Sequence, residues 1–256
     1  MKTKFIKSLV RGGKRAGARN NRGRITTRHR GGGNKRRFRM VDVRYDKTGV
    51  PARILAIEYD PNRTARIAQV LYADGERRYV LAPHGATPGA RFVTGDDVPV
   101  EAGNRTTLRR IPVGTMVYGV ELTRGKGSQL GRSAGVAIQV LAHEDGFTHL
   151  KLPSGEVRKV QWGNAASVGQ VGNREHNLQR IPKAGSQRHR GRRPVTRASV
   201  MNPRDHSYGG GEGRTQRGTK RPKDIWGNIT GGRKTRNKRK ASTKLIMERR
   251  KSKKRK

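Results

Sequence analysis

The sequence predicts a mainly β protein with two small barrels in its middle and extended basic arms at both ends. Short apolar runs recur between residues 38 and 162, with Gly, Pro and Asp between them, a pattern typical of strands joined by tight turns. Glycine provides 34 of the 256 residues, and few segments carry the apolar stripe of a helix. Short strands at this spacing favour closed or half-closed barrels.

The first series of strands precedes residue 100. Val41, Val43 and Tyr45 alternate with polar residues, which predicts a strand with one buried face. Asp74-Gly75 is a strong tight-turn dipeptide and predicts a hairpin between its flanking runs. The strands expected in this series span 38–45, 54–59, 65–72, 77–81 and 90–93.

A second series follows residue 105. Residues 153–156 (PSGE) separate two apolar runs and predict another hairpin. The strands expected here span 115–122, 136–142, 147–152 and 157–162. At the end of the last one, Trp162 is interpreted as a core residue rather than a surface on which bases stack. Tyr59, Tyr72 and Tyr79 are likewise expected mostly in the core.

Charge and apolar residues are segregated along the chain. Residues 1–39 hold 15 basic and no acidic residues, residues 40–180 hold 19 basic and 14 acidic, and residues 181–256 hold 26 basic and 4 acidic. The 141 central residues contain 42 large apolar side chains, against 7 in the first 39 and 11 in the last 76. Only the centre can therefore offset the entropy of ordering its chain. The two ends are interpreted as arms without cores of their own.

Composition also excludes several classes of protein. The formal net charge of +42 would make a free-standing globular enzyme repel itself strongly, so we expect a polyanion-bound protein without catalytic residues. The absence of cysteine excludes disulfides, thiolate zinc sites and a cysteine nucleophile. No apolar run reaches the roughly 18 residues of a membrane span. We expect no metal, no cofactor, no small-molecule substrate and no membrane partner.

The first candidate RNA-binding segment is 17–39 (GARNNRGRITTRHRGGGNKRRFR). Arginine presents a planar fork of donors that fits phosphate oxygens, glycine allows close approach of the backbone, and Asn and His can bond base edges or 2′-hydroxyls. The alternative is a disordered basic tail. The expected RNA-binding residues are Arg19, Asn20, Asn21, Arg22, Arg24, Arg28, His29, Arg30, Gly32, Lys35, Arg36, Arg37 and Arg39.

The second candidate segment is 201–214 (MNPRDHSYGGGEGR). Its consecutive glycines could wrap phosphates, although it lacks the Gly-Lys-Ser/Thr of a Walker loop. Asp205 could orient His206 as a general base, but a contact of His206 with phosphate or base is the favoured interpretation, and His206 with Glu212 does not make a metal site. The expected RNA-binding residues are Asn202, Asp205, His206, Gly209, Gly210, Gly211 and Arg214.

Other basic residues complete the prediction. The loop 125–135 can be a plain surface loop or an RNA contact, and the C-terminal basic runs can be a nuclear address, a solvated tail or an RNA-neutralising arm. Trp226, in a segment with few apolar residues, is a candidate for stacking on RNA. The remaining expected RNA-binding residues are Lys126, Arg132, Lys183, Arg188, Arg190, Arg192, Arg193, Arg197, Lys234 and Arg236.

Several motifs resemble the second protein of the large ribosomal subunit, a universal family, in its bacterial or organellar form. The resemblance covers about residues 17–240, so the basic N-terminus is expected to be the family's arm rather than a presequence. The matching motifs are 19–26 (RNNRGRIT), 29–33 (HRGGG), 57–63 (IEYDPNR), 72–76 (YADGE), 111–115 (IPVGT), 132–135 (RSAG), 152–158 (LPSGEVR) and 201–214.

The resemblance implies an oligonucleotide-binding-type barrel followed by an SH3-like barrel. It places an N-terminal arm at 1–37, the barrels at 38–103 and 104–178, and a basic extension at 179–256. Family members bind large-subunit ribosomal RNA and neighbouring ribosomal proteins, support association with the small subunit, and lie near the peptidyl-transferase centre without catalysing. The expected place is the cytoplasmic ribosome of a bacterium, or alternatively an organellar ribosome. The rival function is general packaging of nucleic acid.

The chain departs from the bacterial pattern at three positions. Ser207 and Tyr208 replace the Pro and the second His that usually follow the Asp-His pair, and His189 stands where a Trp is common. A mechanism that needs a second imidazole is therefore excluded for this chain.

Overall fold

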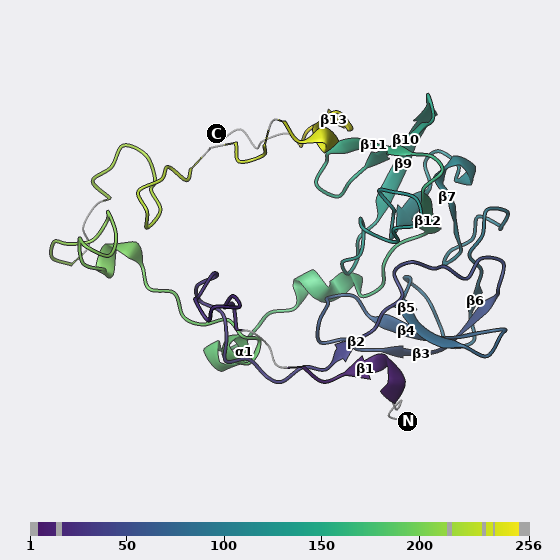
Figure 1. Cartoon of the computed structure of the whole chain (residues 1–256), viewed down its shortest axis with the longest axis horizontal. Helices are drawn as coiled ribbons and strands as arrows, with labels where there is room; N and C mark the ends of the chain where they lie inside the picture. Colours follow the sequence, from purple (N-terminus) through teal and green to yellow (C-terminus); the bar gives the residue numbers. More distant parts are fainter. Residues whose placement is uncertain (1–4, 14–16, 214–216, 232–233, 238, 251–256) are drawn as a thin grey trace. The chain divides into compact units, whose positions relative to one another are not determined.

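A computed structural model describes residues 5–13, 17–213, 217–231, 234–237 and 239–250. The chain divides into two compact units. We call residues 1–14, 36–180 and 241–256 the barrel unit, and residues 15–35 and 181–240 the arm unit. Both strand series lie in the barrel unit, and the described part of the arm unit consists of loops and short helices (Figure 1).

The first barrel is built on an antiparallel sheet in the order β5-β4-β3-β6. Its strands are β3 (Ala52–Glu58), β4 (Ile67–Tyr72), β5 (Arg77–Leu81) and β6 (Arg91–Phe92). Residues of β3 alternate between buried and more exposed positions, as expected for a strand with one face on a core. The predicted Asp74-Gly75 hairpin joins β4 to β5, with Gly75 at φ +85°, a conformation that glycine adopts without strain.

The N-terminal segment lies on this first barrel. After η1 (Lys7–Leu9), β1 (Val10–Arg11) pairs with β2 (Phe38–Arg39) in a small separate sheet. The backbone N–H of Ile6 donates a 3.0 Å hydrogen bond to the Tyr79 hydroxyl. The first residues of the predicted basic arm therefore pack on folded structure.

The second barrel is built on an antiparallel sheet with more strands than the first. In the part of the chain that the structure describes, its strand order is β13-β11-β10-β9-β8-β12-β7. Its core contains Leu108, Val117, Ile138 and Leu150, all fully buried. The strands are β7 (Arg105–Thr107), β8 (Met116–Tyr118), β9 (Ile138–Glu144), β10 (Phe147–Lys151), β11 (Val157–Gln161), β12 (Ala165–Val168) and β13 (Ile246–Glu248).

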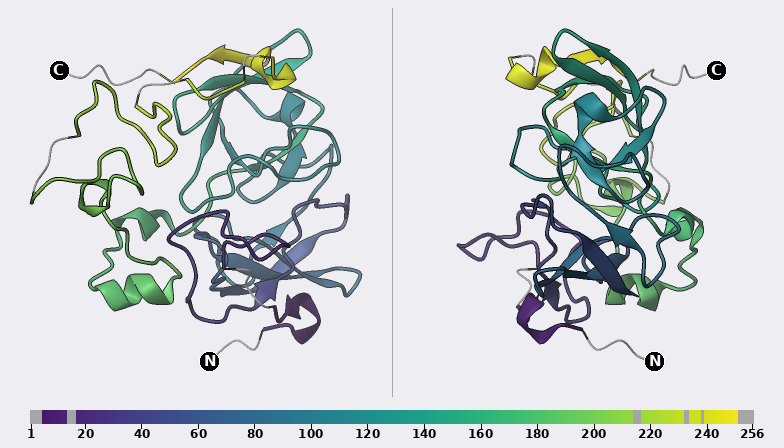
Figure 2. Two further views of the ribbon diagram at one scale, coloured as in Figure 1. Left: turned by 60° about the vertical axis from the view of Figure 1, so that its left-hand side comes forward. Right: turned by 90° about the vertical axis from the view of Figure 1, so that its right-hand side faces the viewer.

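One strand of this barrel comes from the basic C-terminal region. β13 pairs with the edge strand β11 (Figure 2), and the N–H of Lys159 donates a 2.8 Å hydrogen bond to the Leu245 carbonyl. A sheet edge exposes unpaired backbone groups, and β13 pairs with part of this edge, at Val157 and Arg158. The short η5 (Ala241–Thr243) precedes this strand.

A buried arginine joins the two barrels. The Arg105 guanidinium donates to Glu121 Oε1 at 3.0 Å and to the Gly119 carbonyl at 2.8 Å, and it lies 4.7 Å from the ring centroid of Tyr45 in the first barrel. Burial raises the pKa of Tyr45 to about 12, against the lowering effect of Arg105. Because Arg105 is 1% exposed, Glu121 and this ring take the place of water around the buried guanidinium.

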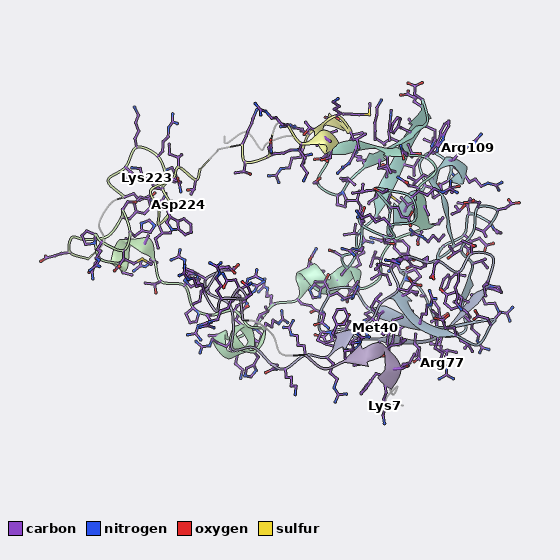
Figure 3. All side chains as sticks on the ribbon, viewed as in Figure 1. Lys7, Met40, Arg77, Arg109, Lys223 and Asp224 are labelled. Carbon is purple, nitrogen blue, oxygen red and sulfur yellow. The ribbon has the colours of Figure 1, made fainter. Side chains whose placement is uncertain are left out.

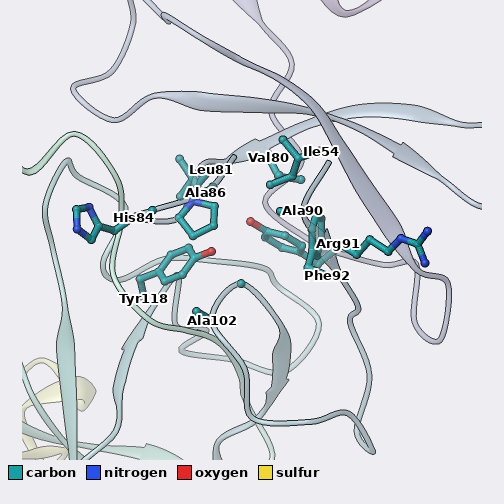
Figure 4. A pocket seen from close by; sticks show the side chains of 14 residues that line it. Ile54, Val80, Leu81, His84, Ala86, Ala90, Arg91, Phe92, Ala102 and Tyr118 are labelled. Atoms are coloured by element: carbon teal, nitrogen blue, oxygen red, sulfur yellow. The ribbon is translucent and has the colours of Figure 1, made fainter. Parts of the chain in front are cut away.

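A small cavity lies along the seam between the barrels. Its volume is about 130 Å³, and Tyr45, Phe92 and Tyr118 are among its lining residues. In Figure 4 the side chains of His84 and Arg91 extend away from its centre. The cavity is therefore walled mainly by aromatic and aliphatic groups.

The structure confirms the mainly β fold class, consistent with an oligonucleotide-binding-type barrel followed by an SH3-like barrel. In the first series, the predicted strand at 38–45 is wrong beyond Arg39, because Asp42 Oδ1 accepts the N–H groups of Arg44 and Tyr45 and the chain turns there, with Tyr45 at φ +55°. Tyr59 is 69% exposed and not a core residue. Tyr72 and Tyr79 are buried as predicted.

Two further differences concern the second barrel. Trp162 is half-buried and lies outside the group of residues that forms the barrel core, so its interpretation as a core residue is wrong. The strands β7, β12 and β13 were not predicted, because short runs such as 105–107 contain too few apolar residues to show alternation. No helix among the described residues is long and apolar enough to cross a membrane.

Candidate nucleic-acid interface

The arm unit is made of two segments that are distant in sequence and paired in space. The N–H of Gly31 donates a 3.0 Å hydrogen bond to the Gly191 carbonyl, and the N–H of Arg193 donates one of 3.0 Å to the His29 carbonyl. An antiparallel bridge joins Arg30 to Arg192. The two basic segments that the sequence analysis treated as separate arms thus form one body, at least through residues 29–34 and 189–193.

A glycine pair makes this pairing possible. A Cβ atom on Gly33 would lie 2.8 Å from Gly191 Cα and 3.0 Å from the His189 carbonyl oxygen, closer than real side chains approach backbone. Gly191 follows the short helix α1 (Ala184–His189) and has φ +86°. Gly33 is therefore required by the close approach of the two backbones, and Gly191 by its positive φ.

The first segment folds into a tight loop that presents its arginines. Residues Arg19 and Ile25 are bridged, and Asn20 Oδ1 accepts 3.0 Å hydrogen bonds from the N–H groups of Arg22 and Arg24. The side-chain oxygen of Asn20 therefore shapes the loop. The sequence analysis had expected this side chain to bind RNA. The exposed predicted residues here are Arg19, Asn20, Asn21, Arg22, Arg24, Arg28, Arg30, Gly32 and Lys35, and His29 is half-buried.

The second segment carries further cations on the same body. η4 (Ala198–Val200) follows α1 without burying a side chain. Dense exposed guanidinium groups on a preformed backbone suit a sugar-phosphate chain. The exposed predicted residues of this segment are Lys183, Arg188, Arg190, Arg192, Arg193, Arg197, Lys234 and Arg236.

His206 is held inside its own loop. Its side chain is 8% exposed, its ring lies 4.8 Å from that of Tyr208, and its Nδ1 accepts a 3.1 Å hydrogen bond from the Tyr208 N–H. An Nδ1 that accepts a backbone N–H leaves the proton of the neutral ring on Nε2. Asp205, which is exposed, therefore cannot orient this imidazole through an Nδ1 proton as a catalytic pair would require.

The glycines of this loop are explained first by packing. A Cβ on Gly209 would overlap the Asn202 carbonyl, and one on Gly210 would lie 2.8 Å from Pro203 Cγ. Asn202, Asp205 and Gly211 are exposed, whereas Gly209 and Gly210 are half-buried, so the first three are the accessible described members of the predicted set. Arg214 lies outside the described residues.

Trp226 projects from a separate turn of the arm unit. Asp224 Oδ1 accepts the N–H groups of Trp226 at 2.9 Å and of Asn228 at 2.8 Å. Burial of Asp224 opposes ionisation, but these hydrogen bonds hold the pKa of its carboxyl below the ordinary value. The Lys223 N–H donates to the Tyr208 hydroxyl and ties this turn to the His206 loop, and Figure 3 labels Lys223 and Asp224. The indole is 79% exposed and available for stacking.

Three predicted residues belong to the barrel unit and have partners there. Arg36 donates to the Pro61 carbonyl at 2.8 Å, Arg37 lies 4.7 Å from the Phe5 ring centroid, and Arg39 is 3.8 Å from buried Asp60. These contacts tie the chain to the first barrel, a role that sequence reasoning missed. Lys126 and Arg132 are exposed on a loop of the second barrel.

Acidic residues of the barrel unit gather around two cations. Arg78 pairs with Asp42, Asp46 and Glu76, and Lys47 pairs with Asp74 and Glu76. The hydrogen bond from Arg78 lowers the pKa of Asp46, and the one from Lys47 lowers that of Asp74. Across the described residues, no group of three or more His, Asp or Glu side chains could hold a metal ion.

Comparison with known proteins identifies the family. Residues 6–94 match the model of "Ribosomal Proteins L2, RNA binding N-terminal domain", and residues 101–227 match that of "Ribosomal Proteins L2, C-terminal domain". A relative from Thiobacillus denitrificans, described as "Large ribosomal subunit protein uL2", is 49% identical over 248 residues, which cover 97% of this chain and 90% of the relative. Two ordered domain matches and this identity show that the chain belongs to the ribosomal protein L2 family, whose members are structural proteins of the large ribosomal subunit and not enzymes.

Proposed function

We propose that the chain binds large-subunit ribosomal RNA directly, chiefly through the exposed cations of the arm unit. The observation that carries this proposal is the concentration of charge on a preassembled body. The arm unit holds 25 basic and 3 acidic residues in two segments, 15–35 and 181–240, that together are much shorter than the barrel unit. Phosphate contacts then supply most of the affinity, and the shape of the paired loops supplies selectivity.

The two barrels contribute the hydrophobic cores of the protein. We place the oligonucleotide-binding-type barrel at 38–103 and the SH3-like barrel at 104–178, between an N-terminal arm at 1–37 and an extension at 179–256. The resemblance supports positions near the peptidyl-transferase centre and in contacts with the small subunit. The proposed place is the cytoplasmic ribosome of a bacterium, with an organellar ribosome as the alternative. In this proposal the protein supports the RNA architecture and leaves peptide transfer to RNA.

Sedimentation of a lysate that contains the tagged full chain tests the proposal. The protein should migrate with large subunits and be released by ribonuclease. Migration with free protein in untreated lysate would contradict it. The rival, a general packaging protein, predicts equal affinity for duplex DNA and ribosomal RNA at the same salt concentration, whereas the proposal predicts a preference for ribosomal RNA.

His206 has a positioning role in this proposal. Its Nδ1 and ring hold the loop at Tyr208, so His206→Ala should weaken RNA binding by loosening the loop. His206→Asn, which can still accept the Tyr208 N–H through its amide oxygen, should retain more binding. Equal and complete loss of translation in both variants, with RNA binding unchanged, would instead indicate a chemical role for the imidazole.

A further inference from the structure

The second barrel carries a cationic groove that contains an aromatic ring. We define the Trp162 groove by Thr107, Arg109, Arg110, Arg124, Trp162 and Gly163, and its volume is about 570 Å³. The Arg109 guanidinium lies 5.3 Å from the centroid of the Trp162 ring, a cation–π arrangement. This groove belongs to the C-terminal family domain, outside the N-terminal domain described as RNA binding.

The backbone holds this ring pair in place. The N–H of Arg109, in η2 (Leu108–Arg110), donates a 3.0 Å hydrogen bond to the Trp162 carbonyl, and the Trp162 N–H donates to Gly146 at 3.1 Å. Leu108, next to Arg109, is fully buried in the barrel core. Both members of the pair are therefore fixed by their main chains, while Trp162 is half-buried and Arg109 exposed. Figure 3 labels Arg109.

The charges around the ring fit phosphate. Arg124 is exposed, and Arg110 forms only an exposed ion pair with Asp97, in which the side chains are 51% and 87% exposed. Such a pair is weak, so Arg110 can exchange Asp97 for a phosphate at little cost. One carboxylate, Asp96, also lines the groove, against three guanidinium groups.

We propose that the Trp162 groove binds one unpaired nucleobase of RNA together with its flanking phosphates. A base offers a π-face for the indole and guanidinium stack, and its phosphates match Arg110 and Arg124. An acidic peptide would match the arginines but offer no π-face to the indole and guanidinium pair, so RNA fits the groove better. The inference rests on the proposed function, since it gives that RNA a second point of attachment, on residues of the barrel unit.

The fluorescence of Trp162 in the full-length chain tests this proposal. The chain contains two tryptophans, so Trp226→Phe leaves Trp162 as the only indole. Titration with a single-stranded oligoadenylate of about six nucleotides should quench it, because stacking brings a base against the ring. An abasic oligonucleotide of equal length should bind without quenching, since it carries phosphates but no bases.

Gly163→Leu, made in the same background, is the blocking variant. A Cβ on Gly163 meets no atom within 4 Å, and Gly163 is not among the residues with positive φ, so leucine fills the groove without strain in the fold. It should abolish the quenching and weaken base-dependent binding by about tenfold. Ser154→Leu, at an exposed position in the turn between β10 and β11, adds similar bulk outside the groove and should quench normally.

The outcomes separate this inference from the proposed function. If anisotropy shows that the oligoadenylate binds while Trp162 fluorescence is unchanged, the groove is not a base site and the proposed function stands. If no RNA binds at all, both fail. Quenching that survives Gly163→Leu, or that polyglutamate produces and RNA does not, also overturns the inference, and the latter result would assign the groove to an acidic protein.

Discussion

The barrel unit and the arm unit achieve order by different means. The barrel unit buries residues such as Ile67, Val117 and Leu150 completely and neutralises many of its cations with carboxylates. In the described residues of the arm unit no hydrophobic side chain is buried, and backbone hydrogen bonds and glycine contacts hold the segments together. Hydrophobic burial stabilises the first unit, whereas loop geometry and backbone hydrogen bonds organise the second.

The largest expected effect is the salt dependence of RNA binding, which should reside in the arm unit. A protein that contacts about ten phosphates loses roughly 10³- to 10⁵-fold in affinity between 50 and 200 mM salt. Replacing four arm residues by Gln should lower the log–log slope of affinity against salt by about 3, because each phosphate contact contributes about 0.7–0.9. The four residues are Arg22, Arg24, Arg192 and Arg193.

The matched control replaces four exposed arginines of the barrel unit in the same way. Filter binding at several salt concentrations should give the unaltered slope for this control. Equal slope changes in the two quadruple variants would remove the distinction between the units. The control residues are Arg53, Arg66, Arg77 and Arg91.

The second effect concerns stability and should be confined to the barrel unit. Glu121→Ala leaves the 1%-exposed Arg105 without its carboxylate, and breaking a buried pair in this way costs about 3–5 kcal/mol. Chemical denaturation measures this loss. Asp97→Ala breaks an exposed pair with Arg110 and should cost at most about 1 kcal/mol, so similar losses in the two variants would contradict the buried role of Arg105.

The third effect is a loss of RNA affinity that leaves the stability of the barrels unchanged. Gly33→Val places side-chain atoms against Gly191 and His189, and overpacking of this kind costs about 1–3 kcal/mol, so RNA affinity should fall about tenfold. Gly13→Val is the control, because a Cβ there meets nothing within 4 Å. The thermal unfolding of the barrels should be unchanged in both. Normal RNA affinity of Gly33→Val would show that the pairing of the two segments is dispensable.

The smallest effect is a pH dependence of the barrel unit. Pairing with Arg78 and Lys47 holds the pKa values of Asp46, Asp74 and Glu76 below their ordinary values of 3.8, 3.8 and 4.5. Folded-state pKa values lowered in this way stabilise the fold above about pH 4, and this stability is lost as the pH falls and the carboxylates protonate. The midpoint temperature of thermal unfolding should therefore decrease as the pH is lowered below about 4. Arg78→Leu should flatten this dependence. A profile that is identical in the variant would contradict the role of Arg78.

Sequence patterns predicted the local elements of the barrels well. The expected strand at 77–81 coincides with β5, and 147–152 and 157–162 each differ from β10 and β11 by one residue. Alternation of apolar and polar residues and turn dipeptides are local signals. They locate a strand when the strand alternates and a recognisable turn flanks it. β7 and β12 lack long apolar runs, and the course of residues 40–45 depends on Tyr45, whose positive φ no local pattern indicates.

The sequence proposed the candidate residues one by one but not how the folded chain brings them together. Most of the expected cations are exposed, which charge patterning alone indicates. That Asn20, Gly209 and Gly210 shape their own loops, and that Arg36 contacts Pro61, could not be inferred, because each role depends on which backbone group lies opposite. Trp162 was predicted in the core from its position at a strand end. Its contact with Arg109 could not be inferred, because Arg109 is 53 residues away in sequence.

The sequence by itself determined the segregation of charge, the β character of the centre, the hairpin at Asp74-Gly75 and the family, since each is written in composition or in neighbouring residues. Only the tertiary structure decided that 15–35 joins 181–240, that β13 returns to β11, and that Arg105 links the two barrels. The physical reason is that buried charges, sheet edges and glycine contacts are satisfied by whichever groups the folded chain brings together, and those groups are distant in sequence.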